Sequence, residues 1–343
     1  MADDERLVES IDSVAFGARR PVRAVFESGV PMLLTVAALL AGVVLLASAA
    51  DQFVIGAARV ALISRISPLV VGVVIIGFGT SCPELLVSAF AAVGGDAEIA
   101  VGNIVGSNIA NLSLLLGVGA LIVPIAVASS TVRREAPITV GAVVLFAVLV
   151  QGGLSRLDGV ILVAAMGFAL WRVIRGSNGG DPLGPETEEL ADPSHHSMRG
   201  EVVRTVIGLI GTIGGAQLLL WGAVDVADRA GLGEGFVGAT LVAIGTSLPE
   251  LVTVVQSARR RETDLIVGNL LGSNLFNALA VGGVVGMIGA PGFDAPSLTT
   301  IAAGAAVLVA VAATWAMTTG RQVQRWEGVV LIGAYAAIVP FLA

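Results

Sequence analysis

Hydrophobic and polar positions along this chain form long blocks, not the short alternation of a surface helix or strand. Apolar stretches of about 20 residues, each long enough to cross a hydrocarbon core of about 30 Å, are separated by short polar segments. The first stretch runs from Val30 to Ala50 and the last from Trp326 to Leu342. The pattern predicts an all-α membrane protein with ten transmembrane helices, five in each half of the chain.

The polar segments divide the chain into four parts. Residues 1–29 form a polar tail that mixes acidic residues with arginines, and no apolar stretch with a cleavage site marks a signal peptide there. We expect the first five-helix repeat over residues 30–175 and the second over residues 201–343. Residues 176–200 form a polar linker rich in glycine, proline and acidic residues.

Two sequence motifs occur once in each half. The motif G-T-S-x-P-E occupies residues 79–84 and again 245–250, and G-N-x-x-G-S-N-x-x-N occupies residues 102–111 and again 268–277. Both pairs have the same offset, since 250 − 84 and 277 − 111 both equal 166. Chance does not preserve one offset across two motifs, so the halves are an internal repeat. Five is an odd number of spans, so the second half enters the membrane from the opposite side, as in the inverted repeats of secondary transporters.

Each first motif places an acidic residue inside an apolar segment. A carboxylate at the centre of a membrane helix costs about 2.5–3.5 kcal/mol on insertion scales, so Glu84 and Glu250 indicate a functional site. Pro83 and Pro249 stand one residue before them and lack an N–H group, which breaks the helix and leaves carbonyl oxygens free to face a cation.

Helical spacing places Thr80 and Ser81 within one turn of Glu84, and it places Asn103, Ser107 and Asn111 on one face of a helix. The second half has the equivalent residues Thr246, Ser247, Asn269, Ser273 and Asn277, and all of these side chains are hard oxygen donors. Such donors favour Ca²⁺, Mg²⁺, Mn²⁺ or Na⁺ over zinc or copper. Two ionised glutamates would be neutralised by one Ca²⁺ or by two or more Na⁺. In low dielectric the pair favours occupation by a cation or a proton, which suits an exchanger.

A packing role is the alternative for each of these residues taken singly. Serine, threonine and asparagine often join membrane helices, and glycines such as Gly102 and Gly106 often allow close helix contacts. Duplication of the whole set argues for more than packing. Asn108 and Asn274 lie off the face shared by their neighbours, and we interpret them as structural.

Composition excludes a soluble protein, and with it a soluble enzyme. The chain is 55% hydrophobic and 13% charged, with a mean hydropathy of +0.91, which is typical of a polytopic membrane protein. It contains no nucleotide-binding motif that could drive a pump, and we expect no cofactor. His195 and His196 lie in the linker without further ligands, so we do not expect them to bind metal.

The two motifs, present once in each half, resemble the repeats of the cation/Ca²⁺ exchanger superfamily, and among its branches the prokaryotic sodium/calcium exchangers. The resemblance implies ten helices, with spans two, three, seven and eight around a central cation site and spans one and six sliding across it. Glu84 and Glu250 would then be shared ligands of Ca²⁺ and Na⁺. The resemblance further implies that Thr80 and Thr246 provide backbone carbonyl ligands to Ca²⁺. It implies flanking Na⁺ sites formed by the carbonyls of Gly77 and Ala243 and by four serines: Ser81, Ser107, Ser247 and Ser273. Asn111 and Asn277 would border the middle of the site.

One departure from the family pattern bears on coupling. Sodium/calcium exchangers often pair an asparagine in one half with an aspartate in the other, whereas both Asn111 and Asn277 are amides here. The sequence therefore predicts a secondary antiporter that exchanges Na⁺ for Ca²⁺ and leaves open a Ca²⁺/H⁺ or K⁺-dependent exchanger on the same fold. A divalent-cation channel is the alternative from another class.

Loop charge predicts the orientation. Segments on one side contain most arginines, whereas the other side has Arg156 and Arg229 apart from the tail. The positive-inside rule then places the linker 176–200 in the cytoplasm and both termini outside the cell membrane. The arginine-rich side includes a predicted loop formed by Arg133, Arg134 and Glu135. We expect a monomer in the lipid bilayer that binds Ca²⁺ and Na⁺, with H⁺ or K⁺ as the alternative coupling ions, and we expect no nucleic-acid partner.

Overall fold

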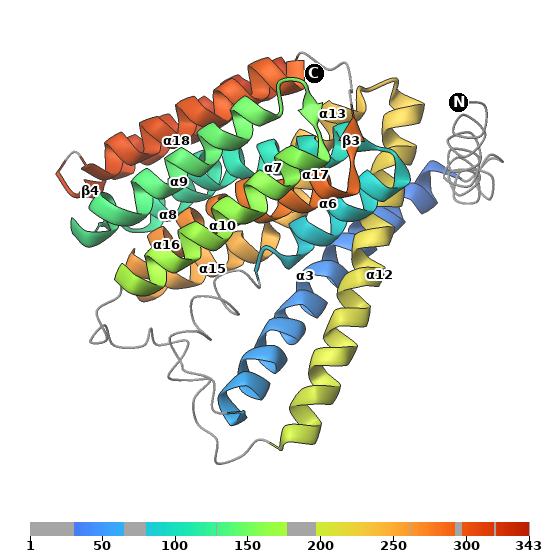
Figure 1. Ribbon diagram of the computed structural model, residues 1–343, viewed down its shortest axis with the longest axis horizontal. Coiled ribbons are helices and arrows are strands. Elements are labelled where there is room, and N and C mark those ends of the chain that lie inside the picture. The colour runs from blue at the N-terminus through green and yellow to red at the C-terminus, as the bar shows by residue number, and fades with distance from the viewer. Residues whose placement is uncertain are drawn as a thin grey trace, which may run out of the picture.

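The structure is a computed structural model that describes residues 31–64, 80–127, 129–176, 197–261, 263–291, 297–318 and 320–342. These residues are almost entirely helical (Figure 1). The first half contains α3 (Met32–Ile63), α6 (Cys82–Gly94), α7 (Ala97–Ala110), the π-helical turn η2 (Asn111–Leu115), α8 (Leu116–Ile122), α9 (Ser129–Leu149) and α10 (Arg156–Gly176).

The second half repeats this order. It contains α12 (Met198–Ala230), α13 (Glu234–Val237), η4 (Gly238–Val242), α14 (Ala243–Thr246), α15 (Leu248–Arg260), α16 (Thr263–Phe276), η5 (Asn277–Val281), α17 (Gly282–Ile288), η6 (Ser297–Ala302), α18 (Ala303–Thr318), α19 (Arg325–Ile338) and η7 (Val339–Leu342). Within the described residues, seven helices are long and apolar enough to span a membrane, and a bent helix pair is an eighth candidate. The predicted all-helical membrane fold is confirmed.

Structural features recur at the offset of the sequence repeat. Helices α3 and α12 begin 166 residues apart, at Met32 and Met198, and the π-helical turns η2 and η5 begin 166 residues apart, at Asn111 and Asn277. Two short antiparallel strand pairs connect the halves. β1 (Ile125–Ala126) pairs with β4 (Gln322–Val323), and β2 (Gly153–Leu154) pairs with β3 (Ala290–Pro291), so each half gives one strand to each pair.

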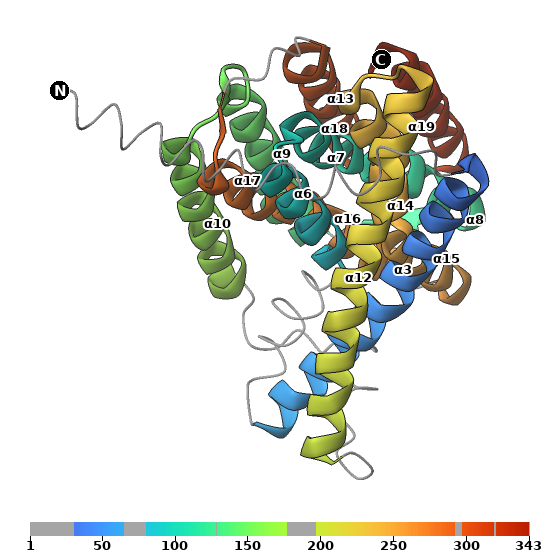
Figure 2. The same cartoon turned by 90° about the vertical axis from the view of Figure 1, so that its right-hand side faces the viewer.

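Helices α3 and α12 form an antiparallel pair that extends beyond the other helices at one end (Figures 1 and 2). Glycines let their backbones meet. A Cβ atom on Gly42 would lie 2.6 Å from the backbone nitrogen of Leu219, and one on Gly208 would collide with the backbone of Phe53. These two contacts are equivalent, since 208 − 42 and 219 − 53 both equal 166. The two halves therefore supply matching surfaces to one long joint.

Two predicted boundaries are wrong. Helix α3 continues to Ile63 and does not end near Ala50, so Arg59 lies within a helix. The extension is explained by α12, which runs alongside it for 33 residues and supplies a carboxylate to Arg59. Helix α9 begins at Ser129, so Arg133 and its neighbours are helical and do not form a loop.

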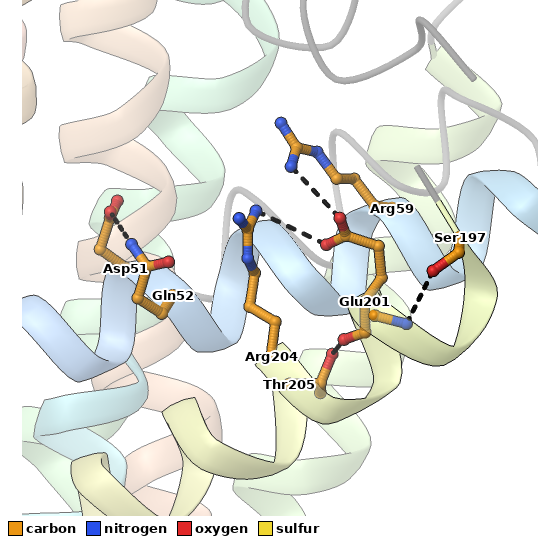
Figure 3. Close-up of polar contacts among 8 residues, drawn as sticks. Asp51, Gln52, Arg59, Ser197, Glu201, Arg204 and Thr205 are labelled. Atoms are coloured by element: carbon orange, nitrogen blue, oxygen red, sulfur yellow. Dashed lines mark hydrogen bonds and ion pairs between the residues drawn. The ribbon is translucent and has the colours of Figure 1, made fainter. Parts of the chain in front are cut away.

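The extended end of this pair has a small charged cluster (Figure 3). The carboxylate of Glu201 on α12 lies 3.4 Å from Arg59 Nη1 on α3 and 3.5 Å from Arg204 Nη1 on its own helix. The Glu201 side chain is 6% exposed and that of Arg59 is 17% exposed, against 36% for Arg204. Shielding from water strengthens the inter-helix pair relative to the exposed one.

We expect Arg59→Gln to destabilise the protein more than Arg204→Gln. Loss of Arg59 leaves a nearly buried carboxylate without its partner from α3 and costs about 1–2 kcal/mol, whereas an exposed pair contributes about 0.5 kcal/mol. Thermal unfolding of both variants in the same detergent measures the difference. Equal unfolding temperatures for the two variants would contradict the assignment of Arg59 as the main partner.

Candidate cation site

The helices break at equivalent serines. Ser81 precedes α6 with φ −88° and ψ 11°, and Ser247 precedes α15 with φ −85° and ψ 11°. Each helix has its proline in the first turn, where the missing N–H is tolerated. The segments on either side of Ser247 are bent by 45°. A serine at this position normally accepts a hydrogen bond from its own helix, but neither serine does so here.

Each serine instead donates a hydrogen bond to the glutamate of the other repeat. Ser81 Oγ lies 3.2 Å from Glu250 Oε1, and Ser247 Oγ lies 3.0 Å from Glu84 Oε1. The two contacts are related by the 166-residue offset, so a pseudo-twofold arrangement brings the motifs together. Ser273 donates a further, longer bond of 3.4 Å to Glu250 Oε1.

The threonines of the first motif also reach across the repeat boundary. Thr246 Oγ1 donates to Asn103 Oδ1 over 3.1 Å, and Thr80 Oγ1 donates to Asn269 Oδ1 over 3.4 Å. Asn103 is held in turn, because its Nδ2 donates to Ser88 Oγ over 2.9 Å. The second motif of each half therefore supports the first motif of the other half.

Burial defines the electrostatics of the site. Glu84 and Glu250 are both 0% exposed, and within the described part of the chain Oε2 of each has no hydrogen-bond partner. Desolvation of a carboxylate costs several kcal/mol unless it is paired. Each carboxylate thus accepts a hydroxyl at Oε1 and leaves Oε2 without a partner among the described residues. A bound cation would stabilise this pair of buried carboxylates. No group of three or more His, Cys, Asp or Glu residues occurs among the described residues, so any further ligands there are neutral oxygens.

Helices α7 and α16 pass into π-helical turns at the residues that we expect at the middle of the site. These turns begin at Asn111 and Asn277, and both asparagines are 0% exposed. Asn111 Nδ2 donates to Asn274 Oδ1 over 3.0 Å. Asn111 Oδ1, both polar side-chain atoms of Asn277, and Ser107 Oγ have no hydrogen-bond partner in the described structure. Single π-helical turns are frequent at functional sites because they change which side chains face inward.

The predicted residues are distributed as follows. Thr80 is half-buried at the edge of this core. The other nine that lie here are buried: Ser81, Glu84, Ser107, Asn111, Thr246, Ser247, Glu250, Ser273 and Asn277. Gly77 lies outside the described residues. The carbonyl oxygen of Ala243 accepts the backbone N–H of Ser247 at 3.1 Å and lies 3.2 Å from Thr246 Oγ1, whose one proton it shares with Asn103 Oδ1.

Two features of the site were missed from the sequence. Ser88 holds Asn103, and Asn274, which we interpreted as structural, contacts Asn111. Ser88 lies four residues after Glu84, on the same helical face, and that spacing was a usable signal. Asn274 gave no such signal, because its contact depends on how two distant helices meet.

Comparison with known proteins identifies the family. A family model described as sodium/calcium exchanger protein matches residues 34–175 and 201–343. The chain belongs to the sodium/calcium exchanger protein family. Among its relatives, CaxA, an antiporter candidate of Alkalimonas amylolytica, is 39% identical over 317 residues, which cover 89% of this chain and 97% of CaxA. The sodium/calcium exchanger MaX1 of Methanosarcina acetivorans is 29% identical over 340 residues, 89% of this chain and 97% of MaX1.

Solved structures of this exchanger family have the same fold. A structure of the sodium-calcium exchanger NCX_Mj, soaked with Na⁺ and Sr²⁺, aligns with a TM-score of 0.64 and 28% sequence identity. The alignment covers 90% of this chain and 99% of NCX_Mj. The chain is thus a multi-pass cation/Ca²⁺ antiporter of the prokaryotic branch and not an enzyme, and the ten-helix inverted-repeat plan fits it. The resemblance drawn from the two motifs is confirmed.

Proposed function

We propose that this exchanger couples Na⁺ entry to Ca²⁺ extrusion by alternating access. The observation that supports this most directly is the pair of fully buried glutamates, each with one carboxylate oxygen bonded across the repeat and the other without a partner in the described residues. Their charge of −2 matches one Ca²⁺ or two or more Na⁺. Both ions take oxygen ligands, the kind of ligand that these side chains supply.

The proposed ligand roles follow the two cross-repeat pairs. Glu84 and Glu250 bind both ions, and Thr80 and Thr246 add backbone carbonyls to Ca²⁺. The flanking Na⁺ sites use Ser81, Ser107, Ser247 and Ser273 with the carbonyls of Gly77 and Ala243, and Asn111 and Asn277 border the middle. The transported ions are substrates, and we propose no resident cofactor.

The helix pair α3 and α12 is proposed to slide across this site. Its glycine-lined joint supports movement as one unit, because the two helices contact each other along most of their length. The charged cluster at its extended end contains Arg59 and Arg204 and lies at the end of α12 that follows the linker. This placement supports a cytoplasmic linker and external termini by the positive-inside rule.

A second candidate, coupling to H⁺ or K⁺, is favoured by one observation. Asn111 and Asn277 are both amides, so the middle of the site has no carboxylate of its own. Fewer fixed charges would allow a different number of Na⁺ ions, or another coupling ion, to balance Ca²⁺.

Ion fluxes in proteoliposomes test the proposal. Vesicles loaded with Na⁺ are diluted into ⁴⁵Ca²⁺ with or without an outward Na⁺ gradient, and parallel samples receive a pH gradient, internal K⁺ or external K⁺. Na⁺/Ca²⁺ exchange predicts uptake only with the Na⁺ gradient. Uptake driven by the pH gradient alone would assign the protein to proton coupling, and a requirement for K⁺ on either side would assign it to K⁺-dependent exchange. Uptake without any counter-ion would indicate a channel.

A further inference from the structure

We propose that Asn274 is a positioning residue that determines which atom of the Asn111 amide faces the cation site. Asn274 lies on α16, and Asn111 begins the π-helical turn η2 of the other repeat. The inference rests on the proposed cation site and adds a residue to it. It depends on two consecutive hydrogen bonds that join the Asn111 amide, the Asn274 amide and the backbone carbonyl of Asn108. The carbonyl fixes the direction of both bonds.

The fixed end is a backbone carbonyl. Asn274 Nδ2 donates to the carbonyl oxygen of Asn108 over 3.0 Å. A carbonyl oxygen can only accept, so the NH₂ group of Asn274 must point toward it. Asn274 Oδ1 therefore faces the opposite way. This reasoning removes the usual ambiguity between the oxygen and nitrogen of an asparagine side chain.

The second step passes this direction to Asn111. Asn274 Oδ1 is an acceptor, and Asn111 Nδ2 donates to it over 3.0 Å. Asn111 Oδ1 is then the atom that remains for another partner, and it is buried without one among the described residues. Asn274 and Asn111 are both 0% exposed, and Asn108 is 2% exposed, so water does not compete for these bonds.

The orientation matters because the two ends of an amide have opposite polarity. An amide oxygen is a ligand for Ca²⁺ or Na⁺, whereas an NH₂ group presents partial positive charge and repels a cation. Without Asn274, the hydrogen bond that directs the NH₂ group of Asn111 away from the site would be lost, and that group would compete with the ion when it faced inward. Asn274 thus keeps an oxygen available before the cation arrives.

The repeat provides an internal comparison. The residues equivalent to Asn111 and Asn274 are Asn277 and Asn108, at the 166-residue offset. In the described structure Asn277 Oδ1, Asn277 Nδ2 and Asn108 Oδ1 all lack partners, so the equivalent chain is not formed. Asn111 is therefore preset by a hydrogen bond, whereas no equivalent bond orients the amide of Asn277 in the described structure. Asn108→Ala is the matched control, because it removes the equivalent side chain and keeps the carbonyl that holds Asn274.

Direct cation binding to the purified full-length protein tests this inference. Isothermal titration with Ca²⁺, and separately with Na⁺, is made for the wild type, Asn274→Ala, Asn111→Ala, the double variant and Asn108→Ala. We expect Asn274→Ala to weaken binding about tenfold, the scale of one hydrogen bond near a charge. The double variant should bind as weakly as Asn111→Ala alone, since Asn274 acts through Asn111. Asn108→Ala should remain within about twofold of the wild type.

The other outcomes overturn the inference in distinct ways. Additive effects of Asn274→Ala and Asn111→Ala, unchanged binding by Asn274→Ala, or an equal loss for Asn108→Ala would each reject the positioning role while leaving the cation site intact. Absence of Ca²⁺ and Na⁺ binding by the folded wild type would reject the proposed site as well. If Asn274→Ala does not fold, Asn274→Leu, which restores volume without an amide, takes its place in the same cycle.

Discussion

Glu84→Gln is expected to abolish Ca²⁺ transport. The change keeps the size of a fully buried side chain but removes half of the negative charge that the two glutamates offer a divalent ion. Removing one partner of a buried charge interaction costs about 3–5 kcal/mol, which corresponds to a loss of about 100-fold or more in affinity. The glutamine amide can still accept the Ser247 hydroxyl through its oxygen, so the cross-repeat contact that Glu84 Oε1 makes is retained and the fold should persist.

The measurement is ⁴⁵Ca²⁺ uptake into Na⁺-loaded proteoliposomes, normalised to the amount of reconstituted protein. Glu250→Gln should show the same loss, because the two glutamates occupy equivalent positions in the repeats. Glu98→Gln in the first turn of α7 is the matched control, since it makes the same substitution outside the site and should leave transport near wild type. Normal uptake by Glu84→Gln would rule out Glu84 as a required ligand.

Much of the site could be predicted because a buried charge leaves a strong sequence signal. Glu84 and Glu250 interrupt apolar segments, each lies next to a proline, and the repeat marks both at once. The family, the inverted repeat and the helical class followed from that signal. The helical spacing of oxygen donors also predicted which side chains share a face, and most of those side chains are buried in one core.

The partners across the repeat could not be predicted in the same way. Residue spacing defines the faces of one helix and does not define which other helix each face meets. Helical spacing therefore places Ser81 with Glu84 of its own turn, whereas the Ser81 hydroxyl donates to Glu250. The length of α3 was underestimated for a related reason. Hydropathy reports the lipid-facing part of a helix, but α3 continues past it because α12 packs beside it and Glu201 pairs with Arg59.

Gly106→Ala is expected to disrupt both the fold and transport. Helix α7 meets the η4 segment of the other repeat with backbone against backbone. A Cβ atom on Gly106 would lie 2.6 Å from Ala239 Cα and closer still to the Ala239 carbonyl oxygen, and one on Gly102, one turn earlier, would lie 2.5 Å from the carbonyl oxygen of Gly235. Backbone atoms cannot move aside as the end of a side chain can. Overpacking costs about 1–3 kcal/mol, and a backbone collision lies at or above the upper end of that range.

This collision would also change the geometry of the candidate cation site. Separation of α7 from η4 also moves α14, whose Thr246 donates to Asn103 on α7. We therefore expect Gly106→Ala to lower the unfolding temperature and to reduce ⁴⁵Ca²⁺ uptake even in the fraction that remains folded. Gly167→Ala in α10 is the control, because an added Cβ there has no neighbour within 4 Å among the described residues. If both variants unfold at the wild-type temperature, α7 and η4 must be farther apart than described, and the packing of the two repeats around the glutamates would need revision.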